Sequence, residues 1–106
     1  MIPAERFTVR AARALQDAVD LARRTGNPAV EDVHLLSALL DQDEGVVGPI
    51  LAKAGADPGA VRAETSAALG RLATQSGAQP SASRELSKVI DDADAQVRRL
   101  DDQYVS

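Results

Sequence analysis

Apolar residues recur at helical spacing through most of the chain, beginning with the stretch that follows Thr8. The Thr8 hydroxyl can cap a helix at its N-terminus, and Gly26-Asn27-Pro28 supplies a C-terminal glycine and a helix breaker. The pattern therefore predicts a first amphipathic helix between Thr8 and Gly26. Its expected buried stripe comprises Ala11, Leu15, Ala18, Val19 and Ala22.

Further helical stretches follow before the chain becomes polar. A second helix is expected from about Asp32 to Asp41, and because it is apolar on more than one side, we expect it to be the central element. Residues 46–54 form a short apolar segment, in which Pro49 is tolerated only near a helix start. Asp57-Pro58 then predicts a helix to about Leu72, because it joins an N-cap to a proline in the first turn. Its expected inward positions are Val61, Thr65, Ala68, Leu69 and Leu72.

The stretch Thr74–Ala82 is rich in Ser, Gly, Gln and Pro, and this composition predicts a linker. Ser83 can then cap a last helix that runs to about Leu100. Its apolar face comprises Leu86, Val89, Ile90, Ala93 and Val97. Because no segment alternates as a strand does, the fold class is predicted to be all-α.

The first and last helical stretches are related in sequence. Thr8–Glu31 aligns without gaps on Ser83–Ser106, with Asp17 on Asp92, Ala18 on Ala93, Arg23-Arg24 on Arg98-Arg99 and Val30 on Val105. A self-match of this kind predicts two copies of one helical unit, although two amphipathic helices can also be alike by chance. The predicted organisation is a first unit at 1–73, a linker at 74–82 and the start of a second, incomplete unit at 83–106.

Composition narrows the function classes. The chain has 106 residues, which suits one domain, and much of its 44% apolar content is alanine, with Phe7 and Tyr104 as the only aromatic residues. Small side chains favour closely packed helices over the bulkier lining of a catalytic pocket. A net charge of −4 opposes nucleic-acid binding, and no cysteine is present for a disulfide or a thiolate site. No stretch resembles a signal peptide or a membrane span, so we expect a cytoplasmic protein without a membrane partner.

Residues that could carry chemistry are few. His34 is the one histidine, and we interpret it as a structural residue at a helix start, with a catalytic or metal role as the alternative. No glycine-rich phosphate loop is present, so the chain is not expected to bind or hydrolyse a nucleotide. The acidic runs at 41–44 and 101–102 lack the calcium-loop pattern and are interpreted as solvated charge. Helices of this kind can leave a groove for an apolar partner segment, or they can pair all their apolar faces internally.

Several motifs together carry a family resemblance. They are Glu5–Thr8, Gly26–Glu31, His34–Leu40, Glu44–Val47, Pro49–Leu51, Gly55–Pro58 and Val61–Glu64. In this combination they resemble the N-terminal repeat of the Clp/Hsp100 AAA+ chaperones, and Ser83–Ser106 also fits. His34–Leu40 and Asp102–Ser106 are most similar to the ClpB disaggregase branch, whereas Glu5–Thr8 would fit the ClpC branch equally well.

The resemblance implies an all-α double Clp-N motif whose second unit is incomplete here. It implies a non-catalytic domain, tethered to a hexameric ring, that binds unfolded or aggregated protein and passes it to the pore of that ring. ATP and Mg²⁺ would belong to AAA+ modules that this chain lacks, so no cofactor is expected in it. The alternative that the resemblance leaves open is a structural or adaptor-docking module, as in ClpA- or ClpC-like unfoldases.

The resemblance also implies candidate substrate-binding residues. Thr8 and Asp102 match positions implicated in substrate binding, although a plain N-cap and a loop cap are equal alternatives for them. Ile90 keeps the apolar character of a groove position, and Tyr104 is a candidate contact for which half-buried packing is the alternative. Asp102–Ser106 resembles the start of the second loop of the family, and a third implicated position would follow Ser106.

The incomplete second unit has an energetic consequence. Its apolar face expects partner helices, and each large apolar side chain left in water forfeits about 1.5–3 kcal/mol. The sequence therefore predicts either self-association or a mobile helix after the linker.

Overall fold

The described part of the chain is helical, as predicted. The computed structural model describes the backbone of residues 9–42 and 45–105 and the side chains of residues 9–42 and 45–100. Five α-helices and one pair of two-residue strands occupy this part. In chain order they are α1 (Val9–Arg24), β1 (Ala29–Val30), α2 (Asp32–Asp41), α3 (Val47–Lys53), α4 (Pro58–Gly70), β2 (Ser81–Ala82) and α5 (Arg84–Val105). The all-α fold class is confirmed.

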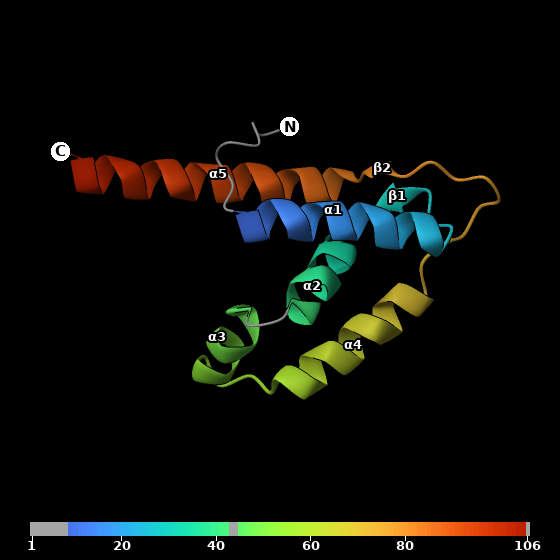
Figure 1. Cartoon of the computed structure of the whole chain (residues 1–106), viewed down its shortest axis with the longest axis horizontal. Helices are drawn as coiled ribbons and strands as arrows, with labels where there is room; N and C mark the ends of the chain where they lie inside the picture. The colour runs from blue at the N-terminus through green and yellow to red at the C-terminus, as the bar shows by residue number, and fades with distance from the viewer. Residues whose placement is uncertain (1–8, 43–44, 106) are drawn as a thin grey trace.

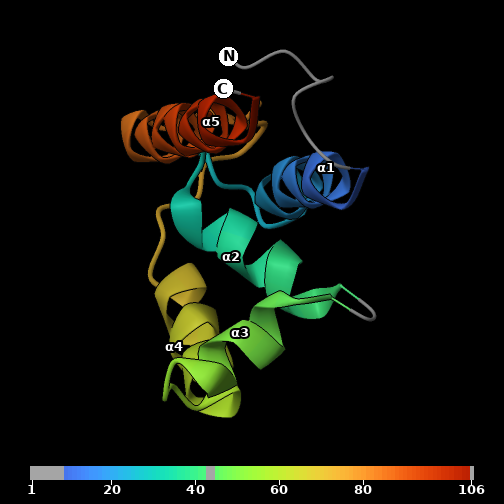
Figure 2. The same ribbon diagram turned by 90° about the vertical axis from the view of Figure 1, so that its left-hand side faces the viewer.

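Helix α2 is the central element, as its apolar sequence predicted. It contacts α1, α3, α4 and α5. Helices α1 and α5 lie on one side of α2 and run in opposite directions, while α3 and α4 lie on its other side (Figures 1 and 2). The molecule measures 51 × 31 × 21 Å, because α5 extends well past the first residues of α1 (Figure 1).

Side-chain caps fix the beginnings of α4 and α5. The Asp57 carboxylate accepts a hydrogen bond from the Gly59 amide at 2.9 Å, and Pro58 occupies the first turn, where its missing N–H costs nothing. The Ser83 hydroxyl oxygen accepts from the Leu86 amide at 3.0 Å, which confirms its predicted capping role. The predicted cap Thr8 lies outside the described residues.

The end of α2 is held by an arginine from another helix. The guanidinium of Arg62 on α4 donates to the Leu40 carbonyl at 2.6 Å and also bonds the Asp41 carboxylate. A cation at this position satisfies a free carbonyl and complements the negative end of the helix dipole. Arg62 therefore joins α4 to α2 in the absence of a basic residue in the last turn of α2.

The core is built largely from small side chains. Ala14, Ala18 and Ala22 of α1 are fully buried, and they pack in one cluster with Val30, Ala38, Leu86 and Ile90. The predicted stripe was right at Ala18 and Ala22 but missed Ala14, whereas Leu15 and Val19 lie at the edge of the cluster. Alanine permits a close approach of helices, so the larger side chains flank the line of contact.

Two predictions about local structure were wrong. Ala29–Val30 and Ser81–Ala82 form a short parallel pair, although no strand was expected. Two residues are too few to carry an alternating pattern, and this pairing exists only because residues 81–82 return beside the end of α1.

The helix that starts after Ser83 also continues to Val105, through the stretch expected to begin a loop. Residues 101–105 contain no glycine or proline to end it.

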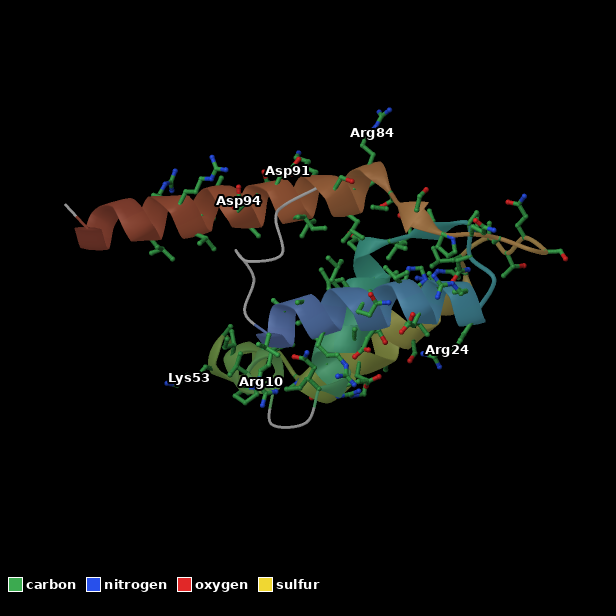
Figure 3. The ribbon with its side chains drawn as sticks, turned by 45° about the horizontal axis from the view of Figure 1, so that its top comes forward. Arg10, Arg24, Lys53, Arg84, Asp91 and Asp94 are labelled. Carbon is green, nitrogen blue, oxygen red and sulfur yellow. The ribbon has the colours of Figure 1, made fainter. Side chains whose placement is uncertain are left out.

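The faces of α5 are unequally covered. Leu86 and Ile90 are buried, whereas Val89, Val97 and Leu100 are 44%, 41% and 52% exposed. Arg84 and Asp91 lie on the side of α5 that faces away from α1 (Figure 3).

The division of the chain into units at 1–73, 74–82 and 83–106 stays a prediction.

Candidate functional site

The four predicted substrate-binding residues are not brought together within the described part of the structure. Ile90 is buried in the core, with 7% of its surface exposed. Asp102 and Tyr104 lie in the backbone of α5, but their side chains fall outside the described residues, and Thr8 lies outside them altogether. The binding roles of Thr8, Ile90, Asp102 and Tyr104 therefore stay predictions.

The structure instead presents an apolar surface on the outer half of α5. We call Ala93, Val97 and Leu100 the α5 strip. Val97 lies seven residues after Ile90, which is about two helical turns, so both side chains belong to the same face of the helix. Ile90 is buried against the core, whereas the three strip residues are exposed. The same face is thus part of the core at one end of α5 and open to solvent at the other.

The charge beside the α5 strip is partly neutralised. Asp94 and Arg98 form an ion pair of 3.2 Å one helical turn apart. The Asp94 side chain is only 16% exposed, whereas that of Arg98 is 60% exposed. Because the carboxylate and the guanidinium offset each other, this pair adds little net charge beside the strip.

Two of the shallow hollows in the described structure border α2. One, of about 470 Å³, lies between α2 and α4 and is mainly apolar, with Val33, Leu36 and Val61 in its lining. The other lies between α1 and α2 and contains Asp17, Asp20 and Asp41. Each of these aspartates pairs with an arginine, since Asp17 bonds Arg13, Asp20 bonds Arg23 and Asp41 bonds Arg62. Neither lining contains a histidine or a cysteine that could supply a base or a thiolate nucleophile.

His34 has a structural role, as its position at a helix start suggested. Its side chain is fully buried, and its Nδ1 accepts a hydrogen bond from the Glu31 amide at 2.8 Å. Its Nε2 lies 2.9 Å from Oδ1 of Asn27. Desolvation lowers the pKa of His34 below 6.5, and this effect outweighs the nearby carboxylates of Glu31 and Asp32, which raise it.

Asn27 is a structural residue that sequence reasoning missed. It is 3% exposed, and it joins the end of α1 to His34 and to the Ala73 carbonyl. From the sequence alone, Asn27 is only the middle residue of a Gly-Asn-Pro turn. A buried asparagine needs partners on both its oxygen and its nitrogen, and one of these partners is distant in the chain.

Two kinds of feature are absent from the described residues. Within 9–42 and 45–100, no group of three or more His, Asp or Glu side chains is placed to hold a metal ion. Among the helices that the structure describes, none is both long and apolar enough to cross a membrane.

The all-α arrangement and the helix motifs agree with one known family. The model of the Clp repeat (R) N-terminal domain matches residues 6–106, which is nearly the whole chain. The chain belongs to the Clp repeat N-terminal domain family. Within this family it is similar to the N-terminal domain of ClpB-type chaperones.

The relatives are bacterial proteins named chaperone protein ClpB. The chain is 43% identical over 101 residues to that of Mycobacterium tuberculosis, 42% over 105 residues to that of Propionibacterium freudenreichii, and 36% over 100 residues to that of Porphyromonas gingivalis. These alignments cover 93%, 96% and 94% of this chain but 12% of each relative. The Clp-N chain thus corresponds to about an eighth of the length of these ClpB chaperones.

Proposed function

We propose that this Clp-N domain engages unfolded or aggregated polypeptides for a cytoplasmic ClpB-type chaperone and passes them to an AAA+ ATPase ring. The observation that carries the proposal is the exposed α5 strip in a domain of this family. In this proposal the domain binds and does not catalyse. ATP and Mg²⁺ act in the ring of the whole protein, and the chain itself holds no cofactor.

The chemistry of the α5 strip supports a role in capturing polypeptides. Unfolded proteins expose short apolar segments, and covering apolar surface on both partners is favourable without a demand for a specific sequence. The exposed Val97 and Leu100 supply such a surface, and it continues from the rigid core through Ile90. A surface of this kind binds many substrates weakly, which suits a first contact before transfer.

The proposal is tested by titrating an unfolded model protein such as casein against the 106-residue chain and its Val97→Asp/Leu100→Asp variant. Covering a large apolar side chain contributes about 1.5–3 kcal/mol, so we expect the double variant to raise Kd by about tenfold or more. Ile50→Asp on α3 is the matched control, because Ile50 is 59% exposed and lies on the opposite side of α2. Equal weakening by the control and by the strip variant would contradict the proposal.

The roles expected for Thr8 and Asp102 need separate variants. If both residues contact substrate, Thr8→Ala and Asp102→Ala weaken casein binding while the thermal stability of the domain is unchanged. If Thr8 only caps a helix, Thr8→Ala lowers stability and leaves binding of the folded fraction intact. A loop cap no longer explains Asp102, because α5 continues past it to Val105.

A docking module for an adaptor protein is the second candidate, and the apolar hollow between α2 and α4 is the observation that favours it. An adaptor would seat on a defined folded surface and would not require the α5 strip. Absence of casein binding by this chain, together with binding of an adaptor that Val33→Asp abolishes, would favour this candidate.

A further inference from the structure

A single buried network joins segments that are far apart in the sequence. His34 lies in the first turn of α2, and Asn27 follows the end of α1. The Nδ2 group of Asn27 donates to the Ala73 carbonyl at 2.9 Å, 46 residues along the chain. Oδ1 of the same amide lies 2.9 Å from His34 Nε2 and 2.5 Å from the Thr25 hydroxyl. Three segments therefore meet at two buried side chains.

The hydrogen bonds fix the protonation state of His34. The Glu31 amide can only donate, so His34 Nδ1 must carry a lone pair. The one ring proton is then on Nε2, and it is donated to Asn27 Oδ1. This bond orients the Asn27 amide, whose nitrogen consequently faces the Ala73 carbonyl. A second proton on Nδ1 would point at the Glu31 N–H and remove the bond between them.

The residues after Ala73 depend on this network for their position. The Gln75 amide donates to the Gly26 carbonyl at 2.7 Å, and the Ser83 amide donates to the Val30 carbonyl at 2.9 Å. Most of the residues from 71 to 83 are exposed, so their attachment to the residues between α1 and α2 rests on such polar bonds more than on apolar packing. The same segment leads into α5, and it therefore sets where α5 begins.

The charges around His34 do not favour a second proton strongly enough to offset burial. On its own helix and N-cap, Asp32 and Glu31 act on the ring. The end of α1 presents the neutral Thr25 and Asn27, while Arg23 and Arg24 are exposed. The segment after α4 presents the Ala73 carbonyl, with Arg71 exposed, and α5 contributes the apolar Leu86 to the core, with Arg84 and Glu85 exposed.

We propose that His34 is a proton-sensitive latch that fastens the 71–83 segment to the residues between α1 and α2. With the ring neutral, Asn27 is held in the orientation that binds Ala73. A second proton on Nδ1 breaks the bond to Glu31 and sets two N–H groups against each other, so the ring shifts away from the Glu31 amide. This shift moves Nε2 away from Asn27, and the loss of that bond frees the 71–83 segment. Acid therefore detaches the segment without unfolding α1.

The latch is tested by amide hydrogen exchange, resolved by NMR and expressed as protection factors, at about pH 7.5 and about pH 5.5. Opening of the 71–83 segment exposes an imidazole of ordinary pKa, so the opening equilibrium constant rises by up to about tenfold between the two pH values. We expect protection of the Gln75 and Ser83 amides to fall several-fold, whereas the Ala18 amide within α1 keeps its protection. Unchanged protection of Gln75 and Ser83 would overturn the proposal.

His34→Gln is the matched variant, because glutamine at this position can still accept from the Glu31 amide but does not titrate. Its Gln75 and Ser83 protection factors are expected to be the same at both pH values. If this variant does not fold, the test uses the ring-nitrogen chemical shifts of His34 in the wild-type protein. His34 is the one histidine, so its titration must follow the loss of protection. A ring that gains its proton while Gln75 stays protected refutes the latch. Neither readout involves a polypeptide ligand, so failure here leaves the proposed function untouched.

Discussion

At the scale of single residues, the buried polar side chains carry the most specific information in this domain. His34, Asn27 and Thr65 are all buried, and each has a hydrogen-bond partner. The Thr65 hydroxyl donates to the Val61 carbonyl within α4, which is a local bond. The pair formed by His34 and Asn27 instead joins distant segments, and removal of either partner would leave a buried polar group unsatisfied.

The free energy of unfolding is expected to depend on pH through His34. Burial lowers its pKa below 6.5 in the native state, so between the two pKa values the unfolded chain binds more protons than the folded chain. The contribution of the neutral His34 ring to the free energy of unfolding is complete above about pH 7. It is lost as the pH falls below 6.5. By about pH 5.5 the loss cannot exceed about 1.4 kcal/mol.

Urea unfolding of the wild type and His34→Gln at these two pH values measures this loss. Carboxylates titrate in both proteins, so the difference between the two pH responses isolates the imidazole. Wild-type stability that changes with pH no more than that of His34→Gln would show that burial does not depress the His34 pKa.

At the scale of the elements, α1 and α5 show that related sequences can bury different faces. The self-match aligns Ala14, Ala18 and Ala22 with Val89, Ala93 and Val97. The three alanines are fully buried against the core, whereas their counterparts on α5 are exposed. Helix α5 buries Leu86 and Ile90 instead. The sequence repeat therefore predicts that two helices exist, while their neighbours decide which stripe each one buries.

The two ends of α5 are expected to differ in their contribution to stability. Ile90→Ala leaves a cavity in the core cluster and should cost about 2–4 kcal/mol of unfolding free energy. Val97→Ala changes an exposed helical position, where lost packing is small and alanine has the higher helix propensity, so we expect a change within about 0.5 kcal/mol.

Denaturant unfolding of both variants at one pH provides the comparison. The two substitutions act on the same helix, so a general effect on helix formation would appear in both. Similar losses from Ile90→Ala and Val97→Ala would mean that the outer half of α5 is packed as tightly as the inner half.

At the scale of the whole molecule, the outer half of α5 gives the domain an elongated shape (Figure 1). Its exposed Val97 and Leu100 also leave an apolar surface open to solvent. A second copy of the chain is one partner that can cover the α5 strip. We therefore expect the 106-residue chain to self-associate as its concentration rises, because pairing two strips removes apolar surface from water.

Sedimentation velocity across a range of concentrations tests this expectation, and Leu100→Asp should return the chain to a monomer. Ile50→Asp, which removes an exposed isoleucine from α3, serves as the control and should not change the association. A stable monomer at every concentration, with the α5 amides protected from hydrogen exchange, would refute both self-association and a mobile last helix.

The sequence by itself determined the helices. Local signals are sufficient for this, since Asp57-Pro58 starts α4, Ser83 starts α5 and the Gly-Asn-Pro turn follows α1. The motifs also determined the family, because they are short stretches of fixed residues that do not depend on packing. The polar composition of residues 74–82 indicated a stretch without a helix, and the position of His34 at a helix start indicated its structural role.

Only the tertiary structure decided what depends on contacts between distant segments. The strand pair, the bond from Asn27 to Ala73 and the bond from Arg62 to the end of α2 each join residues that no local pattern relates. The burial of Ala14 and the exposure of Val97 likewise depend on which helix lies opposite. Helix formation follows from neighbouring residues, whereas burial and buried hydrogen bonds follow from the path of the whole chain.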